Sequence, residues 1–233
     1  MQVQKPVLAA ILFLMVGASS CDNTEIGNSS DVNQDKIYMN YSISAYEESG
    51  NVDLNFQYRF AGSGGTTLLL NEPSQIELDG EKLKADSSKA MGVFYNANKD
   101  LSRFFGKHTI VFTDFNGKKF ENIFDFAPFT INAIPETVDR NKDLVISFNT
   151  LPLGTNDNVE VNSYDTDSSF HYEMTKHSSS ITIPAEEFKR QKQATFSLDF
   201  ELFKDIPLTT TASEGGSLKM YYRLKPIKIK LQP

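Results

Sequence analysis

The chain has 233 residues, and its 30 acidic residues outnumber its 23 basic ones, which gives a formal net charge of −7 at pH 7. An acidic protein is repelled by phosphate backbones, so the composition argues against a nucleic-acid partner. The single cysteine excludes an intrachain disulfide bond, and a hydrophobic content of 39% is typical of a folded globular protein rather than a disordered chain.

Residues 1–20 have the composition of an export signal. Lys5 precedes an apolar run from Val7 to Val16, and small residues follow as far as Ser20. This order is that of a secretory signal peptide. The apolar run has ten residues, whereas a membrane-spanning helix needs roughly 20. We therefore expect the protein to be exported and cleaved after Ser20.

The stretch "ASSC", Ala18 to Cys21, resembles the lipobox of bacterial lipoproteins, in which a cysteine receives a diacylglycerol and becomes the first residue of the mature protein. The resemblance implies lipidation of Cys21, cleavage after Ser20 and attachment to a bacterial membrane, with the outer membrane favoured. Ala18 stands where that family usually has leucine. Because Ala18 and Ser20 also fit the small-residue rule of ordinary signal peptidase, plain secretion with a free Cys21 thiol is the alternative.

Residues 21–35 are predicted to form a flexible tether, because "DNTEIGNSSDVNQD" lacks aromatic residues and has few large aliphatic ones. From Lys36 onward, hydrophobic residues alternate with polar ones, as expected for half-buried β-strands. The first two alternating runs are Ile37–Ala45 and Val52–Phe60. Asp79-Gly80, between "QIEL" and "EKLK", predicts a tight hairpin turn.

Two other stretches of this region are read as connections. "GSGG" at Gly62–Gly65 precedes the strand-like "TTLLL", so we interpret it as a turn and not as a phosphate-binding loop, which would need a helix N-terminus. "NKDLSRFFG" predicts a short helix or an irregular connection, because Leu101, Phe104 and Phe105 are at helical spacing.

The strongest hairpin signal is Asn116-Gly117, within "GKHTIVFTDFNGKKFENIFDF". This stretch resembles the closing hairpin of bacterial immunoglobulin-like domains, where the pattern G-x-Y-T-V-x-x-T-D-x-N-G recurs. His108 stands where that pattern has tyrosine. The resemblance implies a β-sandwich and carries no information about activity.

A linker is predicted at residues 135–141, followed by a second alternating region that begins at Leu144 and ends with Ile227–Leu231. Pro184 with "AEEFKRQ" predicts about one turn of helix within it. The segments 36–134 and 142–233 are each close to the size of an immunoglobulin-like sandwich. We therefore predict an all-β fold of two tandem immunoglobulin-like antiparallel β-sandwiches; a single larger sandwich is the alternative.

No catalytic motif is recognisable, so we predict neither an enzyme nor a cofactor. His171, Glu173 and His177 would lie on one face of an unbroken strand. Such a strand would hold the two histidines about 20 Å apart, too far for one zinc ion. Oxygen ligands for calcium are available in two turn-like stretches, from Asp157, Asp165 and Asp167. We interpret these aspartates as turn residues and predict no metal site.

Four aromatic residues fall on the polar phase of their strands and form the predicted contact surface: Tyr38, Tyr46, Phe203 and Tyr221. The last strands also carry outward charges, which are Asp199, Glu201, Lys219, Arg223, Lys225, Lys228 and Lys230. These charges indicate cross-strand pairing and protection of an edge strand. The alternative is a docking stripe for an acidic partner or a polysaccharide.

Three hypotheses of function follow from the sequence. The first is a non-catalytic, lipid-anchored envelope protein of a bacterium that presents β-sandwiches for binding or assembly. The second is an accessory glycan-binding lipoprotein of a polysaccharide uptake system, with the sugar on the tyrosine-bearing sheet face. The third is an enzyme of unrecognised type.

Overall fold

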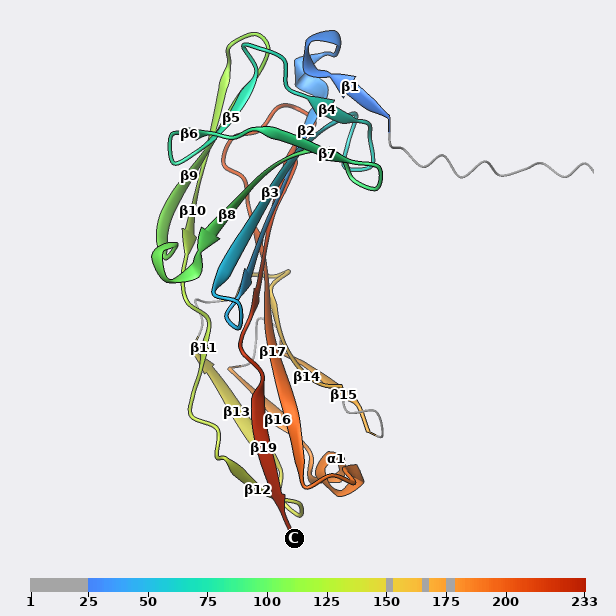
Figure 1. The fold of residues 1–233 in the computed structure, drawn as a ribbon, viewed down its shortest axis with the longest axis vertical. Coiled ribbons are helices and arrows are strands. Elements are labelled where there is room, and N and C mark those ends of the chain that lie inside the picture. The colour runs from blue at the N-terminus through green and yellow to red at the C-terminus, as the bar shows by residue number, and fades with distance from the viewer. Residues whose placement is uncertain (1–24, 150–152, 165–167, 175–178) are drawn as a thin grey trace, which may run out of the picture.

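The computed structural model describes residues 25–149, 153–164, 168–174 and 179–233 (Figure 1). The molecule is elongated: the first strands lie at one end, the C-terminus lies at the other, and strands run along the length between them. The regular structure of the described residues is nearly all strand, and the predicted all-β fold is confirmed. Ser20 and Cys21 lie outside the described residues.

Within these residues, twelve strands form one sheet, here called the large sheet. Its main path has the order β1-β4-β3-β2-β18-β17-β14-β15; in addition β8 pairs with β3, β7 with β8, β19 with β17, and β12 with β19. The strands are β1 (Ile26–Asn28), β2 (Ile37–Tyr46), β3 (Asn51–Phe60), β4 (Thr67–Leu69), β7 (Ala85–Ser88), β8 (Gly92–Asp100), β12 (Thr137–Asp139), β14 (Asn158–Ser163), β15 (Phe170–Met174), β17 (Thr195–Ile206), β18 (Gly216–Arg223) and β19 (Ile227–Gln232).

The described residues also form two smaller sheets and a few short helices. The first small sheet has the order β10-β9-β5-β6, and the second β11-β13-β16. Their strands are β5 (Gln75–Leu78), β6 (Glu81–Lys82), β9 (Gly106–Thr113), β10 (Lys119–Phe126), β11 (Thr130–Ile131), β13 (Leu144–Asn149) and β16 (Ser180–Ile183). The helices are α1 (Ala185–Arg190) and the 3-10 turns η1 (Ser29–Asp31), η2 (Gln34–Lys36) and η3 (Leu101–Arg103). The predicted helical turns after Pro184 and around Leu101 are thus confirmed.

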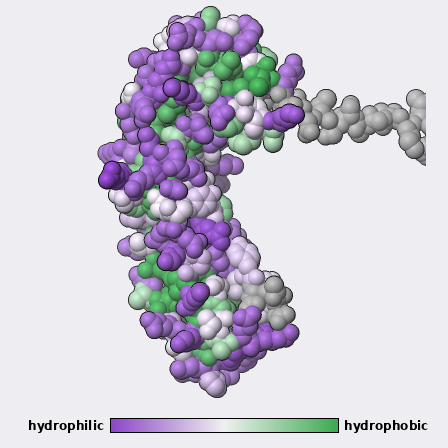
Figure 2. Space-filling model, in the orientation of Figure 1, coloured by the Kyte–Doolittle hydropathy of each residue, from purple (hydrophilic) through white to green (hydrophobic). Residues whose placement is uncertain are grey.

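Alternation along the strands produces the sandwich. In β2, every odd-numbered residue from Ile37 to Ala45 is fully buried, and the even-numbered ones are half-buried. The buried face of the large sheet packs on both small sheets: Tyr58 stacks on Phe112 of β9 with ring centroids 4.3 Å apart, and Phe200 packs against Phe148 of β13 at 6.2 Å. Side chains of the opposite phase are mostly polar, and Figure 2 shows a largely hydrophilic surface.

Buried tyrosines make the fold sensitive to high pH. Burial raises the pKa of Tyr41 and Tyr58, whose hydroxyls lie 3.2 Å apart in the core, and burial together with the charge of Glu47 raises that of Tyr222 to about 12. Unfolding returns these groups to their ordinary pKa of 10.0, so between pH 10 and 12 the unfolded chain binds fewer protons than the folded one. Their contribution to stability is therefore complete below pH 10 and is lost as the pH rises.

We expect a spectrophotometric titration to show this loss. The phenolate absorbance of the native protein should lag behind that of a urea-unfolded sample from pH 10 upward, and it should then rise together with the loss of β-structure in circular dichroism. Equal titration curves for the folded and unfolded protein would contradict the burial of these hydroxyls.

Strands β17 and β18 join the two ends of the molecule (Figure 1). β18 pairs in parallel with β2 over eight residue pairs, from Gly216–Met39 to Arg223–Tyr46. The first part of β17 pairs with β19, and its last part pairs with β18. Residues from the predicted segments 36–134 and 142–233 therefore share one sheet. The division into two domains stays a prediction. Strand β18 belongs to the predicted second segment by its position in the chain, but it pairs with β2 of the first segment.

The prediction of a flexible tether is wrong for residues 25–35. β1 pairs in parallel with β4, and Ser29 is fully buried. Gln34 donates from Nε2 to the Ser29 carbonyl at 2.7 Å, and its Oε1 accepts from the Phe115 backbone N–H at 3.0 Å. The segment has little apolar surface of its own, but distant loops of the sandwich satisfy its polar groups and order it.

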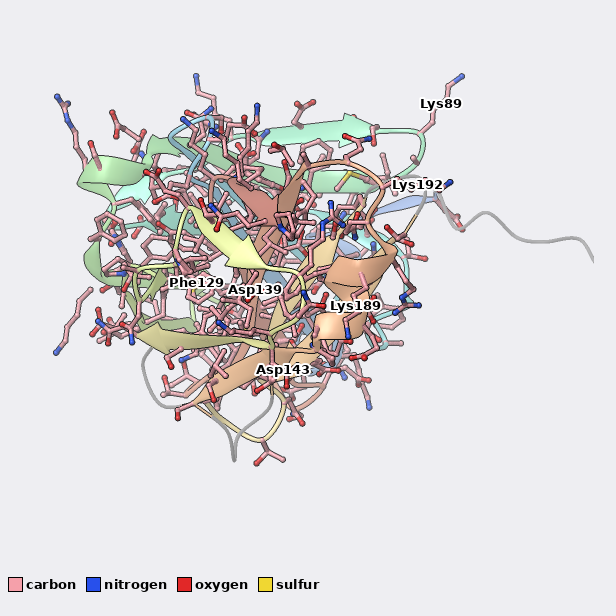
Figure 3. All side chains as sticks on the ribbon, turned by 90° about the horizontal axis from the view of Figure 1, so that it is seen from below. Lys89, Phe129, Asp139, Asp143, Lys189 and Lys192 are labelled. Atoms are coloured by element: carbon pink, nitrogen blue, oxygen red, sulfur yellow. The ribbon has the colours of Figure 1, made fainter. Side chains whose placement is uncertain are left out.

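The predicted linker at 135–141 is also part of the fold. It contains β12, which pairs in parallel with β19. Arg140 donates from Nη1 to the Phe188 carbonyl at 2.9 Å, near the end of α1, and Asp143 accepts from the first backbone N–H of α1 at 2.9 Å. Figure 3, seen from this end of the molecule, shows Asp139 and Asp143 beside the helix that carries Lys189.

Both predicted hairpins are confirmed. Asp79 and Gly80 have φ of 52° and 81° between β5 and β6, as a tight hairpin turn requires. The second hairpin joins β9 and β10 through a five-residue loop, in which Asp114 accepts from the backbone N–H groups of Asn116 and Lys118. His108 of β9 contacts Asp79 Oδ2 through Nδ1 at 2.7 Å. His108, which stands at the tyrosine position of the pattern, thus links the β9–β10 hairpin to the β5–β6 hairpin.

Candidate binding surface

The outward face of the large sheet is a continuous polar surface, here called the outer face. Residues that are directly opposite on paired strands project to the same side of a sheet. One row across five strands contains Asn158, Phe203, Tyr221, Ser44 and Asp53. The next row contains Glu160, Glu201, Arg223, Tyr46 and Asn51. Side chains from both parts of the chain therefore meet on this face, along the β2-β18-β17 strands.

Three of the four predicted contact residues come together on the outer face and are here called the aromatic cluster. The Tyr46 and Tyr221 ring centroids are 5.7 Å apart, and those of Tyr221 and Phe203 are 5.1 Å apart. All three side chains are half-buried. The fourth, Tyr38, lies on the same face near the other end of β2, opposite Arg59, and is not part of the cluster.

A row of carboxylates borders the aromatic cluster. Glu160 on β14 lies opposite Glu173 on one side and Glu201 on the other. Like charges in this arrangement repel each other. Arg223 offsets part of the repulsion, since its Nη2 donates to Asp199 Oδ1 and its Nε lies 3.6 Å from Glu201 Oε1. Pairing of opposite charges across the last strands was predicted, and Arg223 of β18 makes such pairs with Asp199 and Glu201 of β17.

The carboxylates contribute to raising the pKa of two tyrosines of the outer face, Tyr221 and Tyr164. Burial, a hydrogen bond to Glu201 and the charge of that group raise the pKa of Tyr221. The pKa of Tyr164 is raised by burial and then by the charges of Glu201 and Asp199. Tyr164 is 63% exposed and lies just after β14. Tyr164 was not among the predicted contact residues, although it continues the outward period-two series of Asn158 and Glu160.

A shallow groove of about 400 Å³ runs beside the aromatic cluster over β2, β18, β17, β14 and Asn156 just before β14. This volume lies within the usual range of ligand sites, roughly 300–1,000 Å³. Its lining includes two aromatic rings, serine and asparagine side chains and both signs of charge, among them Ser44, Asn158, Glu160, Phe203, Lys219 and Tyr221. Such a groove can hold a ligand by ring contact and by hydrogen bonds.

The residues weighed as metal ligands have other partners. His171 Nδ1 lies 2.7 Å from Asn162 Oδ1. Asp157 is buried and accepts from the backbone N–H of Gly154, which is the turn role we predicted. It also accepts from the backbone N–H of Asp205 on β17, a contact that the prediction did not include. Among the described residues, no three His, Cys, Asp or Glu side chains are grouped to hold a metal ion. His177, Asp165 and Asp167 lie outside the described residues.

The part of the chain that the structure describes contains no helix of the length and apolar character needed to cross a membrane.

Comparison with known proteins gives weak structural likenesses. No protein family and no curated protein matches the sequence. A structure of a 1.5-MDa bacterial ice-binding adhesin is 13% identical, covering 84% of this chain and 64% of that one, with a TM-score of 0.27. The Bacteroides ovatus protein SGBP-B of a mixed-linkage glucan utilization locus, in complex with a heptasaccharide, is 10% identical, covering 78% of this chain and 53% of that one, with a TM-score of 0.24. The chain covers less than two thirds of either structure.

Proposed function

We propose that the protein is a non-catalytic component of a bacterial envelope that is anchored by lipid at Cys21 and binds a ligand or partner through the outer face of the large sheet. The aromatic cluster carries the proposal. Its three rings are half-buried on a surface that is otherwise polar, and Phe203 has no polar atom to place in water. Partly exposed aromatic rings gathered beside a groove are typical of contact surfaces.

The packed N-terminal segment sets the orientation in this proposal. Because residues 25–35 are fixed to the sandwich, only the chain from Cys21 to Glu25 separates the lipid from the folded protein. That chain reaches about 14 Å when fully extended. The end of the molecule that carries β1 would therefore lie beside the membrane, with the C-terminal end pointing away from it (Figure 1). The anchor would sit at the outer membrane, as the sequence favours.

The anchor is tested by the intact mass of the mature protein purified from membranes of a bacterial host. We expect a chain that begins at Cys21 and carries the added mass of a diacylglycerol and a further acyl chain, because stable anchoring takes more than one chain. Cys21→Ser should abolish the added mass and release the protein from the membrane fraction. An unmodified Cys21 would overturn the anchor.

The binding role is tested by photo-crosslinking in intact cells. A benzophenone amino acid at position 221 inserts into nearby C–H bonds of either proteins or glycans. We expect a heavier adduct from position 221 and none from position 123, because Ile123 is exposed on β10 and lies away from the outer face. Position 221 giving no adduct under the same illumination would overturn the outer face as the contact surface.

A further inference from the structure

We propose that the groove beside the aromatic cluster binds a neutral, soluble oligosaccharide chain. This inference rests on the proposed function and assigns the chemistry of its ligand. The groove offers ring faces at Phe203 and Tyr221, polar side chains at Ser42, Ser44 and Asn158, and a balance of charges. A sugar ring has an apolar C–H face and a rim of hydroxyl groups, so it needs these two kinds of contact side by side.

The aromatic rings offer apolar faces to a sugar. Phe203 and Tyr221 lie opposite each other on β17 and β18, with Tyr46 next to Tyr221 on β2. The C–H faces of sugar rings can cover these aromatic faces and remove apolar area from water, which is favourable. In the sheet the three rings are held on rigid strands, so little conformational freedom is lost when a ligand binds.

The polar contacts fit hydroxyl groups. Serine hydroxyls both donate and accept, and an asparagine amide donates from its nitrogen and accepts at its oxygen. A sugar hydroxyl also does both. Ser42 and Ser44 project from β2 on one side of the aromatic rings, while Asn156 and Asn158 lie on the other. A chain lying along the groove would thus meet hydrogen-bonding groups at both edges.

Charge argues for a neutral chain. Within the groove Lys219 lies opposite Asp205, and Lys204 Nζ lies 3.7 Å from Asp157 Oδ2, so the two lysines face carboxylates. The carboxylate row of Glu173, Glu160 and Glu201 borders the same place. An anionic polysaccharide would bring further negative charge to this row, and like-charge contacts at an interface are costly.

The inclination of the rings argues for a soluble chain. The planes of Phe203 and Tyr221 are inclined by 51°, and those of Tyr46 and Tyr221 by 62°. The cluster is therefore ridged and not flat. A chain whose successive sugar rings are turned relative to one another can follow such a surface, whereas the flat face of a crystalline polymer touches only its highest points.

The test is titration calorimetry on the whole mature protein in detergent, against a fixed panel of polysaccharides. The neutral soluble probes are cereal mixed-linkage β-glucan, xyloglucan and galactomannan; the anionic probes are polygalacturonate and chondroitin sulfate; crystalline cellulose serves in a sedimentation assay. We expect at least one neutral soluble probe to bind, and neither the anionic probes nor cellulose to do so. Phe203→Ala and Tyr221→Ala should each weaken binding about tenfold or more.

Tyr38→Ala is the matched control, since Tyr38 is half-buried on the same outer face but outside the cluster. It should leave the affinity unchanged, and thermal unfolding should confirm that all three variants are folded. Binding of no neutral probe, binding of the anionic probes instead, or equal losses in Tyr38→Ala would overturn this inference. A protein adduct from position 221 in cells combined with no sugar binding would leave the proposed function standing and refute only the sugar.

Discussion

Phe129→Ala should lower the free energy of unfolding by about 3–5 kcal/mol, as removal of a buried aromatic ring usually does. Phe129 is 1% exposed and lies between β10 and β11, at the point where the chain leaves the first part of the molecule. Its ring lies 6.1 Å from that of Tyr222 on β18 and 6.0 Å from that of Phe148 on β13. Figure 3 labels it among the interior side chains.

The measurement is equilibrium unfolding in guanidinium chloride, followed by circular dichroism. Because β17 pairs with β19 at one end and with β18 at the other, and β18 in turn pairs with β2, we expect one transition that shifts to lower denaturant as a whole. Phe115→Ala is the control: that ring lies on an exposed loop, and its loss should cost less than about 1 kcal/mol. If Phe129→Ala lowered the free energy of unfolding no more than Phe115→Ala does, the contacts of the Phe129 ring with Tyr222 and Phe148 would not contribute to stability as we expect.

Arg223→Ala should lower the free energy of unfolding by about 2–3 kcal/mol. Asp199 and Glu201 are 6% and 8% exposed, and Arg223 contacts both. Removing the arginine leaves two buried carboxylates without their cation, which costs about 3–5 kcal/mol at fully buried pairs. We expect less here, because the Arg223 side chain is 38% exposed and water already screens the pair.

A second variant separates lost charge pairing from lost packing. In the Arg223→Ala background, Asp199→Asn removes one of the unpaired charges and should recover part of the stability. Lys219→Ala, on the same face of β18 but exposed, should change stability by less than about 0.5 kcal/mol. No recovery in the double variant, measured by the same denaturant titration, would show that Arg223 acts through its packing alone.

Local patterns in the sequence predicted the strands and turns well. Alternation in Ile37–Ala45 and Val52–Phe60 corresponds to β2 and β3, and Asp79-Gly80 forms the expected turn. These features depend on neighbouring residues: one face must be buried, and glycine adopts the required positive φ without strain. For the same reason Tyr46, Phe203 and Tyr221 could be assigned to outward phases from the sequence alone.

The contacts between distant segments were not predictable in the same way. The composition of residues 25–35 suggested a tether, because the groups that order them, such as the Phe115 backbone N–H that bonds Gln34, are far away in the chain. The parallel pairing of β18 with β2 likewise joins segments about 180 residues apart. Backbone hydrogen bonds of this kind are the same for nearly all residue types, so they leave little trace in local composition.

By itself, the sequence determined the all-β class, the positions of most strands and the phase of the side chains along those strands, because the alternation of polar and apolar residues reflects burial of one face of a strand. Tertiary structure alone decided which strands are neighbours and in which register. Register placed Phe203 opposite Tyr221 and Tyr221 beside Tyr46, and it aligned Glu160 with Glu201. A candidate surface made from three separate stretches of chain therefore exists only once the sheet has formed.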